Sequence, residues 1–330
     1  MKTSIEWCDH SINPLRARHK KTGKVGHYCE KIAAGCKHCY SSKMQVRFGT
    51  PEFGGGQLRD EYELFLDESK LAEVRRRKRP TKYFWCDMTD LFGDWVLPEW
   101  LEAIYATIDA TPQHIHMLLT KRPSNIRRLV APKYRENVWL GASVSDQETA
   151  NVLIPELLKC RDLSPVLFLS AEPLLGRVRL TSVGHIPADE EGPNRIGYMA
   201  GPDDGTSGLF VTSEEALKRS GIGWVIVGGE SGPGARPCNV DWVRSIRDQC
   251  QTAGVPVFIK QMGFTTVCPE ETIEAIASKT SEIYRWPEGT HFGNRTGNPA
   301  YNGRQILLKD RKGGDWEEWP DEFRVREIPA

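Results

Sequence analysis

Residues 82–119 read KYFWCDMTDLFGDWVLPEWLEAIYATIDATPQHIHMLL, and this stretch predicts a strand, a helix and a second strand in succession. The runs Lys82–Cys86 and His114–Leu119 are short and mostly apolar, as buried strands are. Between them, Pro98–Ala110 has the apolar spacing of a helix. Pro98 suits its first position because proline lacks the amide hydrogen that would be unpaired there. This order predicts two parallel strands joined by a crossover helix.

The same alternation continues along most of the chain. The further predicted strands are Ser4–Trp7, Asn137–Ala142, Pro165–Leu169, Gly223–Val227 and Pro256–Ile259. The further predicted helices are Pro123–Val130, Asp146–Lys159 and Val240–Ala253, the last with a stop at Gly254. These units favour an α/β fold, a partial or full (β/α) TIM-like barrel of about six to seven parallel strands. We expect the barrel in residues 1–263, an insertion at about 176–221, and a C-terminal extension over 264–330 that packs on the barrel.

Polar residues follow nearly every predicted strand. In a β/α barrel the chemistry lies at the carboxyl ends of the strands, so these residues form the candidate site. In chain order they are Thr89, Asp90, Lys121, Arg122, Ser143, Glu172, Gly228, Gly229, Glu230 and Lys260. Taken alone, the glycines are also explained by a turn after a buried strand, and Lys121 with Arg122 by an exposed loop. Taken together, the residues predict a charged mouth.

Three cysteines lie within eleven residues of the segment CEKIAAGCKHCY, residues 29–40. Thiolates on one short loop can bind an iron–sulfur cluster, and the use of three leaves one iron open to a substrate or cofactor. Cys29, Cys36 and Cys39 are therefore the candidate metal ligands.

Several ordered motifs resemble those of the phage-associated three-Cys-motif family, a domain of unknown function in phages and bacteria that is a divergent relative of radical S-adenosylmethionine enzymes. The motifs are CEKIAAGCKHCY, CDMTDLFGDWV, LLTKRP, LGASV, LSAEPLLG, WVIVGGESGPGARP and VPVFIKQMG. They cover roughly residues 4–180 and 222–263. One departure from the usual radical-enzyme motif is the first gap, which has six residues between Cys29 and Cys36 in place of three.

The resemblance implies a [4Fe-4S] cluster on the three cysteines, with S-adenosyl-L-methionine on the fourth iron and a 5′-deoxyadenosyl radical as the reactive species. It implies cofactor binding by Asp90 and Thr89, with Asp90 as first candidate for the methionyl ammonium. Lys121 and Arg122 suit a carboxylate or phosphate, because arginine can bind one through two nitrogens. Ser143, Gly228 and Gly229 complete this predicted set, and the predicted catalytic residues are Glu172, Glu230 and Lys260.

These features predict an enzyme that abstracts hydrogen from a nucleobase or nucleotide-linked group in phage DNA modification. They do not distinguish an isomerase, a lyase or a transferase. The expected partners are a nucleic acid or nucleotide, an electron donor such as flavodoxin or ferredoxin, and a partner protein from an associated family. The alternative is a nonenzymatic, zinc-stabilised nucleic-acid-binding module, with His27, His38 or Cys8 completing a tetrahedral site.

The composition gives no general preference for a polyanion, because 44 lysines and arginines balance 44 aspartates and glutamates. Any such preference is local. Arg75–Arg79 precedes a predicted strand and is expected on the face opposite the chemistry. A second basic cluster is expected at the mouth, where it could guide a polyanion to the site, and it consists of Arg16, Arg18, Lys20, Lys21 and Lys24. Nine cysteines with no secretory signal or long apolar run predict a reducing cytoplasm, that of the host if phage-encoded, and no membrane span.

Overall fold

The computed structural model describes residues 3, 5–47, 56–180, 196–197, 210–211, 217, 220–232, 234–269, 291–295 and 303–329. The chain forms two compact units. The first contains residues 1–143 and 153–168, and the second contains 144–152 and 169–330. Most of the predicted insertion at 176–221 lies outside the described residues, and the predicted domain boundary at residue 263 stays a prediction.

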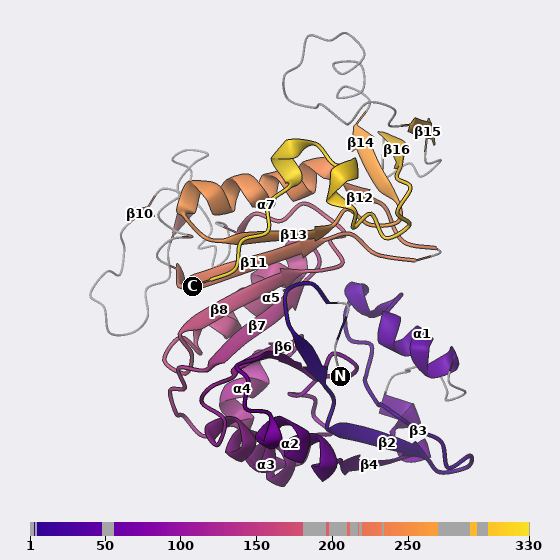
Figure 1. The fold of residues 1–330 in the computed structure, drawn as a ribbon. Helices are drawn as coiled ribbons and strands as arrows, with labels where there is room; N and C mark the ends of the chain where they lie inside the picture. The colour runs from indigo at the N-terminus through magenta and orange to yellow at the C-terminus, as the bar shows by residue number, and fades with distance from the viewer. Residues whose placement is uncertain are drawn as a thin grey trace. The chain divides into compact units, whose positions relative to one another are not determined.

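The main sheet has seven strands in the order β1-β5-β6-β7-β8-β11-β13 (Figure 1). It is a parallel sheet of the partial-barrel α/β class, as the sequence predicted. Its strands are β1 His10–Ile12, β5 Lys82–Trp85, β6 Ile115–Thr120, β7 Val138–Val144, β8 Val166–Ala171, β11 Ile222–Gly228 and β13 Val257–Gln261. Six of the seven predicted strands therefore lie within two residues of their observed bounds.

The first predicted strand, Ser4–Trp7, is wrong. The strand that pairs with β5 is β1, whose residue His10 lies opposite Tyr83. Trp7 is buried for a different reason: its ring packs at 4.7 Å from that of Phe84. The apolar run thus reflects a core contact made by a turn.

The helices between the strands also agree with the sequence pattern. They are α3 Pro98–Asp109, α4 Ser124–Leu129, α5 Gln147–Leu158 and α7 Val240–Ala253. Pro98 occupies the start of α3, and Gly254 ends α7 with a φ of 66°, a left-handed conformation that glycine adopts without steric cost. No described helix is long and apolar enough to cross a membrane.

Smaller elements complete the two units. In the first unit, an antiparallel sheet has the order β3-β2-β4, with β2 Leu15–His19, β3 Val25–Gly26 and β4 Tyr62–Leu66. The same unit contains η1 Ala34–Cys36, α1 Tyr40–Arg47, η2 Gly56–Glu61 and α2 Glu68–Arg76. The second unit contains the pair β9 Ile196–Gly197 and β10 Phe210–Val211. It also has a sheet β12-β14-β16-β15, formed by Cys238–Asn239, Thr266–Pro269, Gly303–Leu307 and His291–Arg295, and the short helices η4 Trp316–Glu318 and η5 Asp321–Phe323.

His116 in β6 gives the first unit a pH-dependent stability. Its imidazole is fully buried, accepts a hydrogen bond from Trp85 Nε1 at Nδ1 (3.0 Å), and lies 3.1 Å from Thr111 Oγ1 at Nε2. Desolvation lowers the pKa of His116 from 6.5 to about 4. The folded state therefore binds this proton more weakly than the unfolded state, so stability falls as the pH falls from 6.5 towards 4.

As the pH falls from 6.5 to 4, we expect the lowered pKa of His116 to decrease the free energy of unfolding by about 3 kcal/mol, at about 1.4 kcal/mol per pH unit. Denaturant unfolding of the wild type and of His116→Gln across the range measures it. A wild type and a variant with identical pH dependence would contradict the expectation.

Candidate active site at the strand ends

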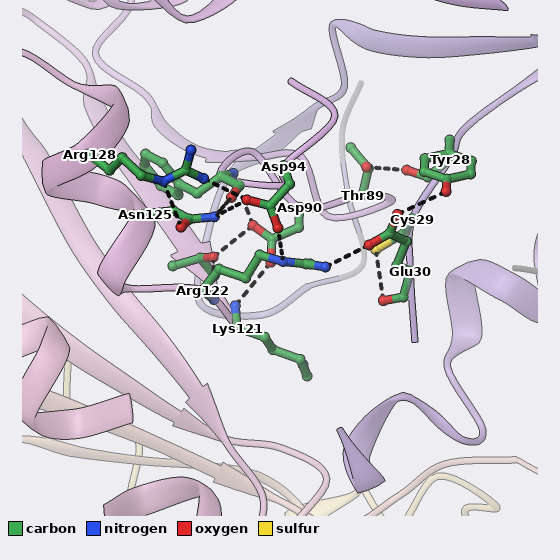
Figure 2. Close-up of polar contacts among 12 residues, drawn as sticks. Tyr28, Cys29, Glu30, Thr89, Asp90, Asp94, Lys121, Arg122, Asn125 and Arg128 are labelled. Atoms are coloured by element: carbon green, nitrogen blue, oxygen red, sulfur yellow. Dashed lines mark hydrogen bonds and ion pairs between the residues drawn. The ribbon is translucent and has the colours of Figure 1, made fainter. Parts of the chain in front are cut away.

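The cysteine loop is tied at both ends to the segment that follows β5. Before the first cysteine, the hydroxyl of Thr89 donates to the carbonyl oxygen of Tyr28, a contact drawn in Figure 2. After the last cysteine, Tyr40 donates its hydroxyl to the carbonyl oxygen of Asp87, and Ser41 donates to that of Met88 at 2.7 Å. Three contacts between segments far apart in sequence thus hold the loop at the carboxyl end of a parallel strand.

The turn after β5 has an unusual backbone that allows these contacts. Cys86 has a φ of 60°, a left-handed conformation that is rare for a residue with a Cβ. Asp87 follows, and its carboxylate accepts from Asn13 Nδ2 at 2.5 Å. Burial raises the pKa of Asp87, although its hydrogen bonds act in the opposite direction. A strained residue beside a carboxylate with a raised pKa is typical of a functional site.

Arg122 ties the loop to the end of β6. Its guanidinium binds Glu30 at 2.8 Å and Asp94 at 3.5 Å (Figure 2). It also lies 4.9 Å from the ring centre of Trp95. Its side chain is only 11% exposed, so the arginine is not a simple solvated loop residue. Because Glu30 directly follows Cys29, this ion pair positions the first cysteine.

Asp90 joins the segments after β5 and β6. It is buried, and its carboxylate accepts three hydrogen bonds: from Phe92 N (3.0 Å), Thr120 Oγ1 (2.7 Å) and Lys121 N (3.1 Å). A buried carboxylate with three protein donors holds the two loops in a fixed relation. Lys121 in turn directs its Nζ to Ser143 Oγ at 2.8 Å, so these two predicted cofactor-binding residues meet.

The three cysteines are neighbours of one another and of these polar groups. Desolvation raises the pKa of the Cys29 thiol, electrostatic interactions with Asp90, Cys39 and Cys36 raise it further, and Lys121 lowers it. The backbone of the loop is compact, since Cys36 N donates to Ala33 O at 2.9 Å and Cys39 N donates to Cys36 O at 3.3 Å. Helix α1 begins directly after Cys39.

The chemistry of the three cysteines suits an iron–sulfur cluster, because thiolates are the usual ligands of such clusters. Within the part of the chain that the structure describes, no three His, Cys, Asp or Glu side chains are positioned to hold a single metal ion. A single zinc requires sulfur ligands about 2.3 Å from one point. A cluster instead binds each thiolate through a different iron, so its ligands surround a larger volume. Cys29, Cys36 and Cys39 are free thiols on one anchored loop, and so provide the donor atoms that such a cluster uses.

The second unit contains the remaining predicted residues. Glu172, which follows β8, forms an ion pair with Lys260 in β13, with Oε1 and Nζ 2.9 Å apart. Ser170 Oγ donates to the other carboxylate oxygen at 3.2 Å. Gly228, at the end of β11, leaves room for this pair, because a Cβ there would lie 3.0 Å from Glu172 Oε1. Glu172 and Lys260, which were both predicted to be catalytic, therefore form one ion pair.

Glu230 is engaged elsewhere in the same unit. Both of its carboxylate oxygens bind Arg236: Nη2 donates to Oε1 at 2.7 Å, and the backbone N and Nε donate to Oε2 at 2.8 and 3.1 Å. Gly229 is needed for packing, because a Cβ there would lie 2.2 Å from the carbonyl oxygen of Met262. In this structure, Glu230 closes the loop 230–236 and Gly229 allows two segments to approach closely.

Breaking the Glu172–Lys260 pair should destabilise the protein. The two side chains are 13% and 25% exposed, so Lys260→Met leaves a largely buried carboxylate without its cation. We expect the free energy of unfolding to fall by about 1–3 kcal/mol. The control is Lys159→Met, which breaks an exposed pair with Glu156 and should change stability by less than about 0.5 kcal/mol. Equal effects in denaturant unfolding would contradict a special role for Lys260.

Sequence reasoning missed the residues that anchor the cysteine loop. They are Tyr28, Glu30, Tyr40, Ser41, Asp87 and Trp95. Asp87 carried a signal, since it stands first in the DMTD motif after a predicted strand. For Tyr28 and Tyr40, the only signal in the sequence was their position directly beside the first and last cysteines.

Fold and site together define an α/β protein whose parallel strands form a partial barrel, with a three-cysteine loop tied to the strand ends. The chain belongs to the family described as "Protein of unknown function (DUF5131)", whose model matches residues 2–305. The expected association with phages stays a prediction. Among curated proteins, none matches the chain significantly.

Solved structures of spore photoproduct lyase are similar to the chain at a low level. A cysteine-to-serine mutant has 9% sequence identity and a TM-score of 0.37, over 94% of this chain and 71% of that one. A cysteine-to-alanine mutant with dinucleoside spore photoproduct has 9% identity and a TM-score of 0.35, over 82% and 65%. The chain thus spans 65% of the length of this second structure.

Proposed function

We propose that this protein is a radical S-adenosylmethionine enzyme. The observation that supports the proposal best is the attachment of the cysteine loop at both ends to the segment after β5, through Tyr28 with Thr89 and through Tyr40 with Asp87. That attachment brings three thiols to the carboxyl end of a parallel sheet, where β/α enzymes keep their chemistry. When bound, the cluster and S-adenosyl-L-methionine would supply a 5′-deoxyadenosyl radical for hydrogen abstraction.

The residues of the first unit would bind and orient the cofactors. Cys29, Cys36 and Cys39 hold the cluster. Lys121 places a positive charge near Cys29 and beside Ser143, and so suits an anionic group of the cofactor. Thr89, Asp90 and Arg122 complete the cofactor-binding set. Their observed contacts indicate that they act by fixing the loops on which the cysteines and Lys121 lie.

The residues of the second unit would act on the substrate. Glu172 and Lys260 are an acid–base pair that can hold or transfer a proton at the carboxylate or the ammonium. Gly228 provides space beside that carboxylate, while Gly229 and Glu230 shape the loop that follows β11. We propose a nucleobase or nucleotide-linked group as substrate, in phage DNA modification within the host cytoplasm, with flavodoxin or ferredoxin as electron donor and a partner protein from an associated family.

Metal analysis and cofactor cleavage test the proposal. The protein is purified without oxygen, and its iron, sulfide and zinc are measured. It is then mixed with dithionite and S-adenosyl-L-methionine, and 5′-deoxyadenosine is detected. About four irons per chain with nucleoside formation would support the enzyme. One zinc per chain with no cleavage would overturn it and favour the zinc-stabilised binding module.

A further inference from the structure

Five consecutive basic residues, Arg75–Arg79 (RRRKR), connect α2 to β5 and are here called the basic segment. Arg75 and Arg76 form the last turn of α2, and the others lie between the helix and the strand. The proposed radical chemistry uses none of them. Because the segment precedes β5, it lies at the amino end of that strand, opposite the end that holds Asp87 and Thr89.

The backbone of the basic segment is fixed by hydrogen bonds. Arg77 N donates to Val74 O at 3.1 Å, and Gln113 Nε2 donates to Arg77 O at 3.1 Å. Thr81 Oγ1 donates to Arg79 O at 2.8 Å. Arg76, Lys78 and Arg79 are nevertheless exposed. A held backbone with exposed cations presents positive charge at a defined place.

Within the described residues, none of the five basic side chains forms an ion pair, whereas other arginines of the same unit do: Arg18 with Glu63, Arg122 with Glu30, Arg127 with Asp162, Arg128 with Asp94 and Arg135 with Asp109. The adjacent carboxylates serve other groups. Glu73 pairs with Lys70, and Asp9 accepts from the backbone N of Lys82.

Stabilisation of helix α2 by basic residues at its carboxyl end explains only part of the basic segment. Basic residues in the last turn of a helix are favoured because they lie near its partial negative charge. This effect covers Arg75 and Arg76, and Arg75 has a further local role because it donates to Thr107 Oγ1 at 2.7 Å. Lys78 and Arg79 lie beyond the helix. Helix stabilisation therefore does not explain them.

We propose that the basic segment binds the phosphate backbone of a nucleic acid. Four of its five residues are arginines, whose planar guanidinium groups bind phosphate oxygens through paired hydrogen bonds. A membrane-binding segment would add exposed apolar side chains, and the described chain has no large exposed apolar residue between 71 and 82. Contacts to phosphates carry no sequence information, so this surface positions a nucleic acid without selecting its sequence.

The test is the affinity and salt dependence of DNA binding by two matched variants. Arg76→Gln, Lys78→Gln and Arg79→Gln are combined in one variant. The control combines Lys133→Gln, Lys159→Gln and Arg161→Gln, which remove the same charge from exposed positions of the same unit that belong to neither basic cluster. Fluorescence anisotropy with a short labelled DNA duplex is measured over a range of salt concentrations. Unfolding curves check that each variant is folded.

We expect the first variant to bind at least about tenfold more weakly than wild type. Its plot of log K against log salt should be less steep by about 2.7, at about 0.9 per lost phosphate contact. The control should lose less affinity and keep the wild-type slope.

Equal losses in both variants would mean that net charge alone governs binding and would overturn the proposal. Binding of wild type to vesicles with anionic lipids, without binding to DNA or RNA duplexes, would also overturn it. The binding assay needs neither S-adenosyl-L-methionine nor a reductant. Its failure is therefore distinguishable from failure of the proposed radical chemistry.

Discussion

Replacing Cys36 with alanine is expected to abolish both the iron–sulfur cluster and the formation of 5′-deoxyadenosine. Cys36 is buried at the end of η1, where its N–H and carbonyl oxygen are both used in backbone hydrogen bonds to Ala33 and Cys39. The loop therefore fixes the backbone that carries the thiol. With three cysteines as the complete protein ligand set, loss of one leaves two ligands and removes the binding site. Iron and sulfide analysis measures the first effect, and chromatography of the reaction mixture measures the second.

The matched control is Cys160→Ala. Cys160 is also fully buried, but it follows α5 and is remote in sequence from the cysteine loop. This variant should keep the cluster and form 5′-deoxyadenosine at the wild-type rate, with stability lowered by about 1 kcal/mol through the small cavity. Undiminished nucleoside formation by Cys36→Ala would contradict the three-cysteine cluster. Loss of activity in both variants would point to general damage.

The strands and helices were predictable where local pattern and burial agree. KYFW in β5 and VFI in β13 are apolar because both faces of a parallel strand are covered, and Pro98 and Gly254 mark helix ends by their own backbone restrictions. The failure at Ser4–Trp7 has a physical cause. Trp7 is as apolar as a strand residue, but it packs on Phe84 from a turn, and no local pattern distinguishes the two.

The site was predictable as a set of strand ends but not as a set of contacts. The sequence pattern placed Lys121 and Ser143 among the residues that follow the strands, and the structure shows that Lys121 Nζ donates to Ser143 Oγ at 2.8 Å. The pairing of Arg122 with Glu30 joins residues that are 92 positions apart, and nothing in either local sequence specifies it. For the same reason, the sequence predicted that Asp90 would be available to bind the cofactor. In the structure its carboxylate accepts three hydrogen bonds from the protein.

Replacing Asp90 with asparagine is expected to lower the free energy of unfolding by about 2–3 kcal/mol, the cost of leaving a buried donor facing another donor. The carboxylate accepts from Lys121 N through one oxygen and from Phe92 N and Thr120 Oγ1 through the other. An amide keeps only one acceptor oxygen, so its NH₂ group faces at least one N–H or O–H group. Denaturant unfolding measures the loss.

Asp94 provides the control for this prediction, because it lies in the same loop but is exposed. Its side chain is 62% exposed where it meets Arg128 and Arg122, and Asp94→Asn should cost no more than about 1 kcal/mol. The pair of variants also separates two roles for Asp90. A carboxylate that holds the loops together changes stability and cluster retention when it is replaced. If the carboxylate instead binds the methionyl ammonium, its replacement would raise the Km for S-adenosyl-L-methionine and leave the free energy of unfolding unchanged. Since both oxygens of Asp90 already accept from the protein, we expect the stability loss to be the larger effect.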